Sequence, residues 1–342
     1  MIPVDKSVFD TEDLPSVERF KAWQESIGVI FDVTLDDRVD PLAFNARLEA
    51  MRLGQILLGK IVSQTQRFQR SREKIISDRL DCYLVQVFLK GSCEMQDGRH
   101  IRKVRPGDVY IIDAGAPLDA VNYDFSNLTA IIPRDLMSRD LIRPDAHHRR
   151  VIPGDTPLAK MLYDYICNIH ANSSSMPVDD AVIASSALLA LTQGLLNARL
   201  PKAPGQLDDE TIDIAIRAKV IDFIDANLGD HSLNPSHVVA ALGISRTRLY
   251  RLFEPYGGVA AEIRHRRLRC TLQDLFDQKS RTMRISEVAL RGGFGSESDY
   301  IRAFKRRYNM TPSEARAARS VTLSSATKRN YEYEKWIASL AP

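Results

Sequence analysis

Short runs of alternating apolar and polar residues characterise the chain between about residues 45 and 135. Four of these runs predict strands: Gln55–Gln64, Tyr83–Lys90, Cys93–Met95 and Val109–Asp113. Turn signals separate them: Gly91-Ser92, Asp97-Gly98 and Pro106-Gly107-Asp108. Asp-Gly is typical of a hairpin turn, and regularly spaced short strands are typical of a barrel or sandwich. We therefore predict a β domain in this part of the chain.

Helical spacing replaces this alternation after about residue 157. The apolar positions of the first predicted helix are Leu158, Met161, Leu162, Tyr165 and Ile169. A second helix is predicted from Val178 to Leu200. Its acidic Asp179 and Asp180 lie in the first turn and Arg199 lies at the end, as the helix dipole favours.

The remaining chain predicts a linker, a helical domain and a tail. Residues 201–210 are rich in Pro, Gly and charge, which indicates a linker. Residues 211–319 show the spacing of consecutive short helices and no strand pattern. The tail from 320 to 342 carries Tyr331, Tyr333 and Trp336 and predicts a short terminal helix.

The segment Pro235–Phe253, PSHVVAALGISRTRLYRLF, predicts a helix-turn-helix unit. Gly243 can end the first helix in a left-handed conformation, and Ser245 can cap the second helix. The residues predicted to face inward are Val238, Val239, Leu242, Ile244, Leu249, Leu252 and Phe253. A capped basic helix after a glycine turn is the pattern that places a recognition helix in the DNA major groove.

The segment Ile285–Arg307, ISEVALRGGFGSESDYIRAFKRR, repeats this pattern. Residues 292–295 turn the chain, with Phe294 inside the turn, and Ser296 caps the next helix. The predicted inward residues are Ile285, Val288, Ala289, Tyr300, Ala303 and Phe304. A single such helix pair is usually plain packing, but two with matching caps favour DNA binding.

The stretch between the two units predicts one long helix from Val259 to Phe276, with Arg264, Arg266, Arg267 and Arg269. Such a rigid spacer would let the units enter successive major grooves, which lie about 34 Å apart on one side of DNA. Residues 241–319 hold 17 basic and 8 acidic residues, a net charge of +9, whereas the whole chain carries only +3. This imbalance indicates a polyanionic partner for the helical domain.

Length and composition set the broad class. The chain has 342 residues, 44% of them hydrophobic, which is enough for two domains. Its cysteines, Cys82, Cys93, Cys167 and Cys270, form no CxxC pair, which fits a reducing compartment. There is no signal-peptide pattern, and the most apolar stretch, Ala181–Leu196, falls short of the ~20 apolar residues of a membrane span. We therefore expect a cytoplasmic protein without a membrane partner.

Residues 211–319 resemble the DNA-binding domain of the AraC/XylS transcription regulators. The resemblance is carried by GGFGSESDYIRAFKRRYNMTPSEAR from Gly292 to Arg316, by LGISRTRLYRLF and by Arg267-Leu268-Arg269. The sequence departs from the family pattern at Asn309, Ile301 and Ala315. Asn309 tolerates the left-handed turn of the usual glycine, and the other two departures affect only base preference.

This resemblance implies that the exposed faces of both recognition helices read bases in double-stranded DNA. The predicted base readers are Arg246, Thr247, Tyr250 and Arg251 in the first unit and Glu297, Ser298, Ile301 and Arg302 in the second. Arg251 and Arg302 are the strongest candidates, because a bidentate arginine–guanine pair contributes roughly 1–3 kcal/mol of discrimination. The predicted phosphate contacts are Ser245, Ser296, Lys305, Arg306 and Arg307. The alternative for each arginine is a solvated surface charge.

The N-terminal part resembles the cupin-like sensor domain of a branch of the same family, through residues Gly91–Asp113 and Ile132-Pro133-Arg134. The resemblance implies a β-barrel that senses a small-molecule effector, with nearby helices used for dimerisation. The helix Val178–Leu200 would then make the homodimer contact, or else pack on its own domain. An activator would also contact RNA polymerase, and no cofactor is expected.

These predictions combine into an α+β protein. A cupin-like β-barrel with flanking helices occupies residues 1–155, and a helical dimerisation or linking segment occupies 156–200. The linker 201–210 leads to an all-α DNA-binding domain with two helix-turn-helix units at 211–319, and 320–342 form a tail.

Catalytic chemistry is not expected. A metal-dependent cupin needs clustered histidines and a carboxylate, whereas this chain has His100 in the barrel region and His147-His148 after it. Cys82 and Cys93 are predicted as small buried residues. Arg67, Arg70 and Arg72 are predicted as solvated charges, with an anionic-ligand site as the alternative. No GxSxG, HExxH or Walker motif is present.

Two other functions remain open from the sequence. One is an architectural DNA-binding protein that needs no effector. The other is a cupin enzyme fused to a DNA-binding domain.

Overall fold

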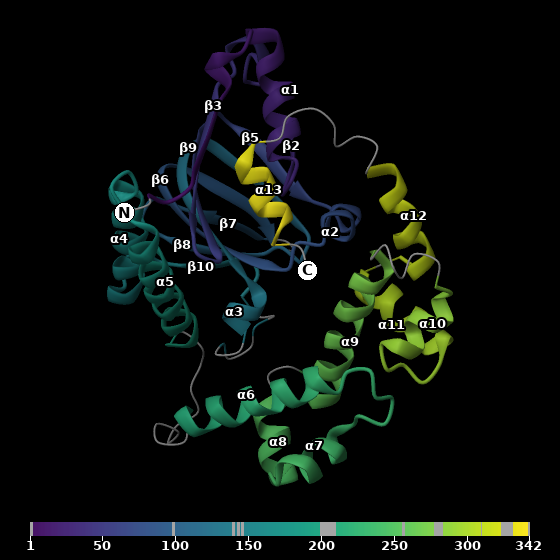
Figure 1. The fold of residues 1–342 in the computed structure, drawn as a ribbon. Helices are drawn as coiled ribbons and strands as arrows, with labels where there is room; N and C mark the ends of the chain where they lie inside the picture. The colour runs from purple at the N-terminus through teal and green to yellow at the C-terminus, as the bar shows by residue number, and fades with distance from the viewer. Residues whose placement is uncertain are drawn as a thin grey trace. The chain divides into compact units, whose positions relative to one another are not determined.

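A computed structural model describes residues 3–97, 100–138, 141, 144, 147–198, 210–254, 257–276, 283–308, 310–322 and 331–340. The chain divides into two compact units (Figure 1). Each unit has a hydrophobic core of its own. The first comprises Met1–Ser138, Ala146–Arg199 and Lys328–Pro342, and the second comprises Arg139–Asp145 and Leu200–Thr327. The C-terminal end of the chain therefore belongs to the first unit.

In its described residues the first unit is built on a ten-stranded antiparallel sheet. Its strands are β1 (Lys6–Asp10), β2 (Asp32–Leu35), β3 (Ala46–Leu53), β4 (Ile56–Ser63), β5 (Gln66–Arg70), β6 (Cys82–Asp97), β7 (His100–Val104), β8 (Val109–Asp113), β9 (Leu118–Pro133) and β10 (Arg150–Ile152). The main path runs β1-β3-β4-β9-β6-β8-β10, and β2, β5 and β7 pair off it.

Two 16-residue strands, β6 and β9, let the sheet bend around one core. They pair from Cys82↔Pro133 to Met95↔Ala120, with irregular register between Phe88 and Ser92. One half of β9 pairs with β4 and the other half with β5. Apolar side chains from both halves then pack into a single cluster, which gives the cupin-like form expected from the sequence.

The prediction of separate strands before and after Gly91-Ser92 was wrong. β6 continues through these residues, and the extra residues are absorbed as a bulge, which bends a strand without ending it. The Asp97-Gly98 hairpin was correctly placed, because Asp97 pairs with His100 across β6 and β7. Residues 98–99 themselves lie outside the described residues.

Six α-helices and two short 3-10 helices accompany the sheet among the described residues of this unit. They are α1 (Ser16–Ile27), α2 (Arg72–Asp78), α3 (Arg134–Ser138), α4 (Pro157–Asn172), α5 (Val178–Ala198), α13 (Glu332–Ala338), η1 (Thr11–Asp13) and η2 (Pro41–Ala43). Both predicted helices after residue 157 are present as α4 and α5. Met161, one of the apolar positions of the first predicted helix, is 57% exposed, because the buried stripe of α4 runs through Leu162, Ile166 and Ile169.

Helix α5 buries one face on its own domain. It packs on α3, α4 and β3, and its buried residues include Ser185, Leu188 and Thr192. By length and mean hydropathy (1.5) it nevertheless meets the criterion for a membrane span, which the sequence interpretation expected this stretch to miss. The exposed face carries Val182 and Ile183.

The second unit is all-helical in its described residues. Its helices are α6 (Glu210–Ala226), α7 (Pro235–Leu242), α8 (Arg246–Phe253), α9 (Val259–Phe276), α10 (Ile285–Arg291), α11 (Glu297–Tyr308) and α12 (Pro312–Thr322). The expected linker falls on residues 201–209, which lie outside the described residues, and Glu210 already belongs to α6. Val220 and Ile224 of α6 pack with Val238, Leu249 and Phe253 in one cluster.

Candidate nucleic-acid interface and barrel cavity

Helices α7 and α8 form the first predicted helix-turn-helix unit. Gly243 ends α7 with a φ of +63° and donates its N–H to the carbonyl of Val239. Ser245 caps α8 by accepting a hydrogen bond from the N–H of Arg248. Leu249 and Phe253 are fully buried, so the inward face of α8 is the one predicted from its spacing.

Helices α10 and α11 form the second predicted helix-turn-helix unit. Gly293 takes a φ of +76° in the turn, and Phe294 is buried beside the ring of Tyr300. Ser296 accepts a hydrogen bond from the N–H of Asp299 at 3.1 Å and thereby caps α11. Tyr300, Ala303 and Phe304 are buried as predicted.

Helix α9 has the bounds predicted for the spacer and contacts α8, α10, α11 and α12. Two of its arginines serve the fold. Arg266 is 10% exposed and pairs with Asp225 at 2.6 Å and with Glu262. Arg267 donates to the carbonyls of Leu228 (3.1 Å) and Asp230 (2.6 Å). The net charge of +9 over residues 241–319 therefore overstates the positive charge that is available to DNA.

The predicted base readers of α8 are exposed, but two of them have protein partners. Arg246 donates to the Ser236 hydroxyl at 2.8 Å. Arg251 pairs with Asp213 of α6 at 3.0 Å, and Arg248 contacts the same carboxylate at 2.8 Å. Thr247 is exposed, and Tyr250 is 52% exposed. The Asp213 carboxylate would therefore compete with a base for the Arg251 guanidinium.

The predicted base readers of α11 present a more open face. Glu297 and Ser298 are exposed, and Ile301 is half-buried. Arg302 is 75% exposed, and its guanidinium lies 3.8 Å from Asp299. Its looser pairing makes Arg302 a better candidate for base contact than Arg251.

The predicted phosphate contacts divide into two kinds. The hydroxyl oxygens of Ser245 and Ser296 already accept the N-cap hydrogen bonds, although both side chains are exposed. Lys305, Arg306 and Arg307 are exposed near the C-terminal end of α11. Lys305 and Arg306 follow Arg302 at spacings of three and four residues and share its face, whereas Arg307 lies about 140° around the helix.

The bent sheet of the first unit encloses a cavity of about 60 Å³. Alternate residues of the strands line it, as the two-residue period of a strand requires. The lining residues include Leu84 and Gln86 of β6, Tyr110 and Ile112 of β8, Ala120, Asn127 and Thr129 of β9, Ile27 of α1, and Tyr333 and Ile337 of α13. Among the described residues of this lining there is no Asp, Glu, Lys, Arg or His.

A few polar atoms are buried among these apolar residues. Gln86 donates to the Thr129 hydroxyl at 2.9 Å. The Tyr110 hydroxyl and the Asn127 side-chain carbonyl are buried without a hydrogen-bond partner within the described part of the chain. Both residues line the cavity, and since buried polar groups are nearly always hydrogen-bonded, these two atoms lack the partners that their burial calls for.

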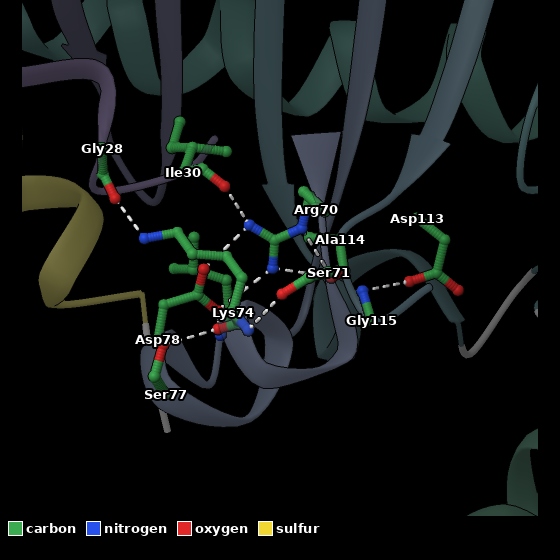
Figure 2. Close-up of polar contacts among 11 residues, drawn as sticks. Gly28, Ile30, Arg70, Ser71, Lys74, Ser77, Asp78, Asp113, Ala114 and Gly115 are labelled. Carbon is green, nitrogen blue, oxygen red and sulfur yellow. Dashed lines mark hydrogen bonds and ion pairs between the residues drawn. The ribbon is translucent and has the colours of Figure 1, made fainter. Parts of the chain in front are cut away.

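One wall of the cavity is fixed by a buried charge (Figure 2). The Arg70 side chain is fully buried and pairs with Asp78 of α2 at 2.8 Å. It also donates to the Ala114 carbonyl at 2.8 Å and to the Ile30 carbonyl, and Lys74 donates to the Gly28 carbonyl. The prediction of a solvated charge was wrong for Arg70, because Asp78 and these carbonyls replace its water.

Cys82, Cys93, His147 and His148 are occupied by burial or by contacts within the first unit. Burial raises the pKa of the Cys82 and Cys93 thiols to about 12, so both stay protonated as small core residues. His147 is buried, and a ring nitrogen of His148 lies 2.9 Å from the Pro117 carbonyl. In the described part of the chain no three His, Cys, Asp or Glu side chains are placed to hold a metal ion. The side chain of His100 lies outside the described residues.

Comparison with known proteins identifies a known domain family in each of the two units of the chain. The chain matches the AraC-binding-like domain family over residues 24–200 and a helix-turn-helix domain family over residues 238–318. The protein belongs to the AraC family of transcription regulators. This AraC-family regulator thus has an N-terminal ligand-binding domain and a C-terminal DNA-binding domain.

Relatives of this AraC-family regulator include transcriptional activators. It is 26% identical over 308 residues to the transcriptional activator NphR of a Rhodococcus species, covering 88% of this chain and 90% of NphR. It is 25% identical over 244 residues to an uncharacterized protein in the nit 5' region of Bacillus sp. (strain OxB-1), covering 70% of this chain and 92% of that protein. The crystal structure of the AraC-like transcriptional activator CuxR matches with a TM-score of 0.55 and 26% identity, covering 77% of this chain and 94% of CuxR.

Two parts of the AraC-family regulator escaped the sequence interpretation. One is the Arg70 contact network. The other is the packing of α13. The sequence predicted a short terminal helix here, but not that its Tyr333, Trp336 and Ile337 are buried in the core of the first unit. Their spacing of three and four residues was a usable signal, because it places them on one apolar face that needs a partner.

Proposed function

We propose that this regulator reads a promoter site with α8 and α11 in two successive major grooves. Its activity is controlled by an uncharged small molecule that binds in the barrel cavity. One observation carries the DNA-reading part: two helix-turn-helix units with hydroxyl-capped second helices pack on one continuous helix, α9. The predicted base readers on α8 and α11 point away from the buried faces of these helices.

The chemistry of the cavity supports the choice of effector. A largely apolar lining with no Asp, Glu, Lys, Arg or His among its described residues disfavours a charged ligand, because burying an uncompensated charge is costly. The Tyr110 hydroxyl and the Asn127 carbonyl can satisfy a polar group on the occupant. A neutral molecule with an apolar body and one or two hydrogen-bonding groups fits both requirements.

The proposal extends to the regulator's assembly and its setting. The exposed Val182 and Ile183 of α5 are the surface we assign to a homodimer contact. As an activator in the cytoplasm, the protein would contact RNA polymerase at its promoter. It would act as a regulator and carry out no catalysis.

Arg302→Ala tests the assignment of base reading. We expect a loss of about 1–3 kcal/mol on a duplex selected by the wild-type protein and little change on a shuffled duplex, because a base contact discriminates and a phosphate contact does not. Fluorescence anisotropy at fixed salt measures both affinities.

Arg306→Ala, on the same exposed face, is the matched comparison. It should weaken binding to both duplexes alike and reduce the salt slope by about 1. Equal losses on the two duplexes for Arg302→Ala would show that this arginine touches only phosphate.

A further inference from the structure

The last helix of the chain packs on the ligand-binding domain. α13 follows the DNA-binding domain in the sequence, yet it contacts β1 and β3 of the first unit. The rings of Phe9 and Tyr331 lie 4.8 Å apart. Tyr333, Trp336 and Ile337 are at most 8% exposed and belong to the same core cluster as the barrel strands.

Two α13 residues, Tyr333 and Ile337, line the cavity itself. With them in place the cavity measures about 60 Å³. A protein cavity that holds benzene is roughly 150 Å³, so a molecule with a single ring needs more room than this one offers. A ring-sized effector must therefore move part of the wall.

The other walls are held by directed bonds. The strands are held by the ladder of the sheet. The segment after α1, which contributes Ile30, is tied down by Arg70 and Lys74 through the carbonyls of Ile30 and Gly28 (Figure 2). Tightly bonded walls resist displacement, which leaves α13 as the movable part.

The docking of α13 is a balance of opposing contributions. Burial of its apolar face favours docking, and the Ser26 hydroxyl contacts both the Tyr333 hydroxyl and the Glu334 carboxylate. Glu334 is half-buried, and no salt bridge to it is found within the described residues. Burial raises the pKa of this carboxyl, so the charged form opposes docking at neutral pH.

We propose that α13 is an intramolecular plug, which an uncharged ring-sized effector displaces from the barrel cavity. This inference rests on the proposed function, in which that cavity is the effector site. Both ends of the DNA-binding domain lead along the chain into the first unit, through residues 199–209 and 323–330. When α13 is displaced, the DNA-binding domain is attached to the folded first unit at one end only. This change in attachment communicates occupancy of the cavity to the DNA-binding domain.

Cyclohexanol, an uncharged six-membered ring with one hydroxyl, is the probe, and calorimetry on the full-length protein measures its affinity. The informative variant is Ser26→Ala, because Ser26 holds α13 but does not line the cavity. A plug predicts that Ser26→Ala binds cyclohexanol about tenfold more tightly, since the fraction of open cavities rises. Lys335→Ala, an exposed change on the same helix, should leave the affinity unchanged.

Trp336 supplies an independent readout. It is one of two tryptophans in the chain, and Trp336→Phe isolates its contribution to the fluorescence. Because Trp336 is only 8% exposed when α13 is docked, saturating cyclohexanol should make it more accessible to acrylamide quenching. Equal or weaker binding by Ser26→Ala, or greater protection of Trp336 with the probe, would show that α13 is a lid completing the site and would overturn the plug.

Failure of the proposed effector site has a different signature. Ala120→Val narrows the cavity at a residue remote from α13 in sequence and should weaken cyclohexanol binding. Absence of saturable binding, or binding that Ala120→Val leaves unchanged, removes the cavity as the effector site and the plug with it. Probe binding that responds to Ala120→Val but not to Ser26→Ala removes only the plug.

Discussion

Replacing Arg70 by methionine should lower the free energy of unfolding of the first unit by about 3–5 kcal/mol, because it leaves the buried Asp78 carboxylate without its cation. The carbonyls of Ile30 and Ala114 also lose their donors. Trp23 and Trp336 both belong to the first unit, so tryptophan fluorescence during urea unfolding follows that unit. All of these contacts are made by the Arg70 side chain, so one substitution removes them together and the expected loss of stability is large.

Arg67→Met is the matched control for this prediction. Arg67 lies on the same strand and pairs with Asp119 at 2.6 Å, but the two side chains are 50% and 41% exposed. A solvated pair contributes about 0–1 kcal/mol, so this variant should unfold almost like the wild type. The double variant Arg70→Met/Asp78→Leu should regain most of the lost stability, since it removes the stranded charge. A loss for Arg70→Met no larger than that for Arg67→Met would contradict the role assigned to the buried pair.

The substitution Gly293→Ala should destabilise the DNA-binding domain by about 2–4 kcal/mol and weaken specific DNA binding with it. Gly293 has a φ of +76°, which an L-residue adopts only with strain. An added Cβ would also lie 2.2 Å from the Leu228 carbonyl oxygen and 2.7 Å from the Arg267 guanidinium. Thermal unfolding followed by circular dichroism measures the loss, because helices dominate this unit.

Gly295→Ala is the control two residues away in the same turn. An added Cβ there meets no atom within 4 Å, and Gly295 is not among the residues with positive φ. Its melting curve and DNA affinity should match those of the wild type. Equal effects of the two substitutions would mean that the turn tolerates side chains at Gly293 and that its close approach to α9 is not required.

The DNA-binding domain was predictable because its signals are local in sequence. Gly243, Ser245 and Ser296 lie within a few residues of the helix ends that they define, and the observed caps match the predicted ones. The bounds of α9 followed from an uninterrupted helical pattern. The local pattern did not show which arginines pair with carboxylates of the protein. Arg251 and Arg266 pair with aspartates on α6 that are far away in sequence.

The sequence predicted that the first unit is a β domain, but it did not predict the contacts between residues that are far apart in sequence. Alternation identified β-rich segments, and turn residues located a hairpin, but they also split the continuous β6 in two. Ser26 and Tyr333 meet although 307 residues separate them, and no periodic pattern reports such a pairing. The burial of Arg70 likewise depends on carbonyls from two other segments, so its sequence neighbours indicate only a charged strand end.

Selection of bound sequences from a random duplex pool, with the full-length protein at near-physiological salt, tests the central claim most directly. Two recognition helices carried by one rigid α9 predict an enriched motif of two short blocks whose centres lie about 10–10.5 base pairs apart. Arg302→Ala should then erase preference in one block and keep the other. Enrichment of a single block, or binding without any enriched motif, would contradict a regulator that reads DNA with both α8 and α11.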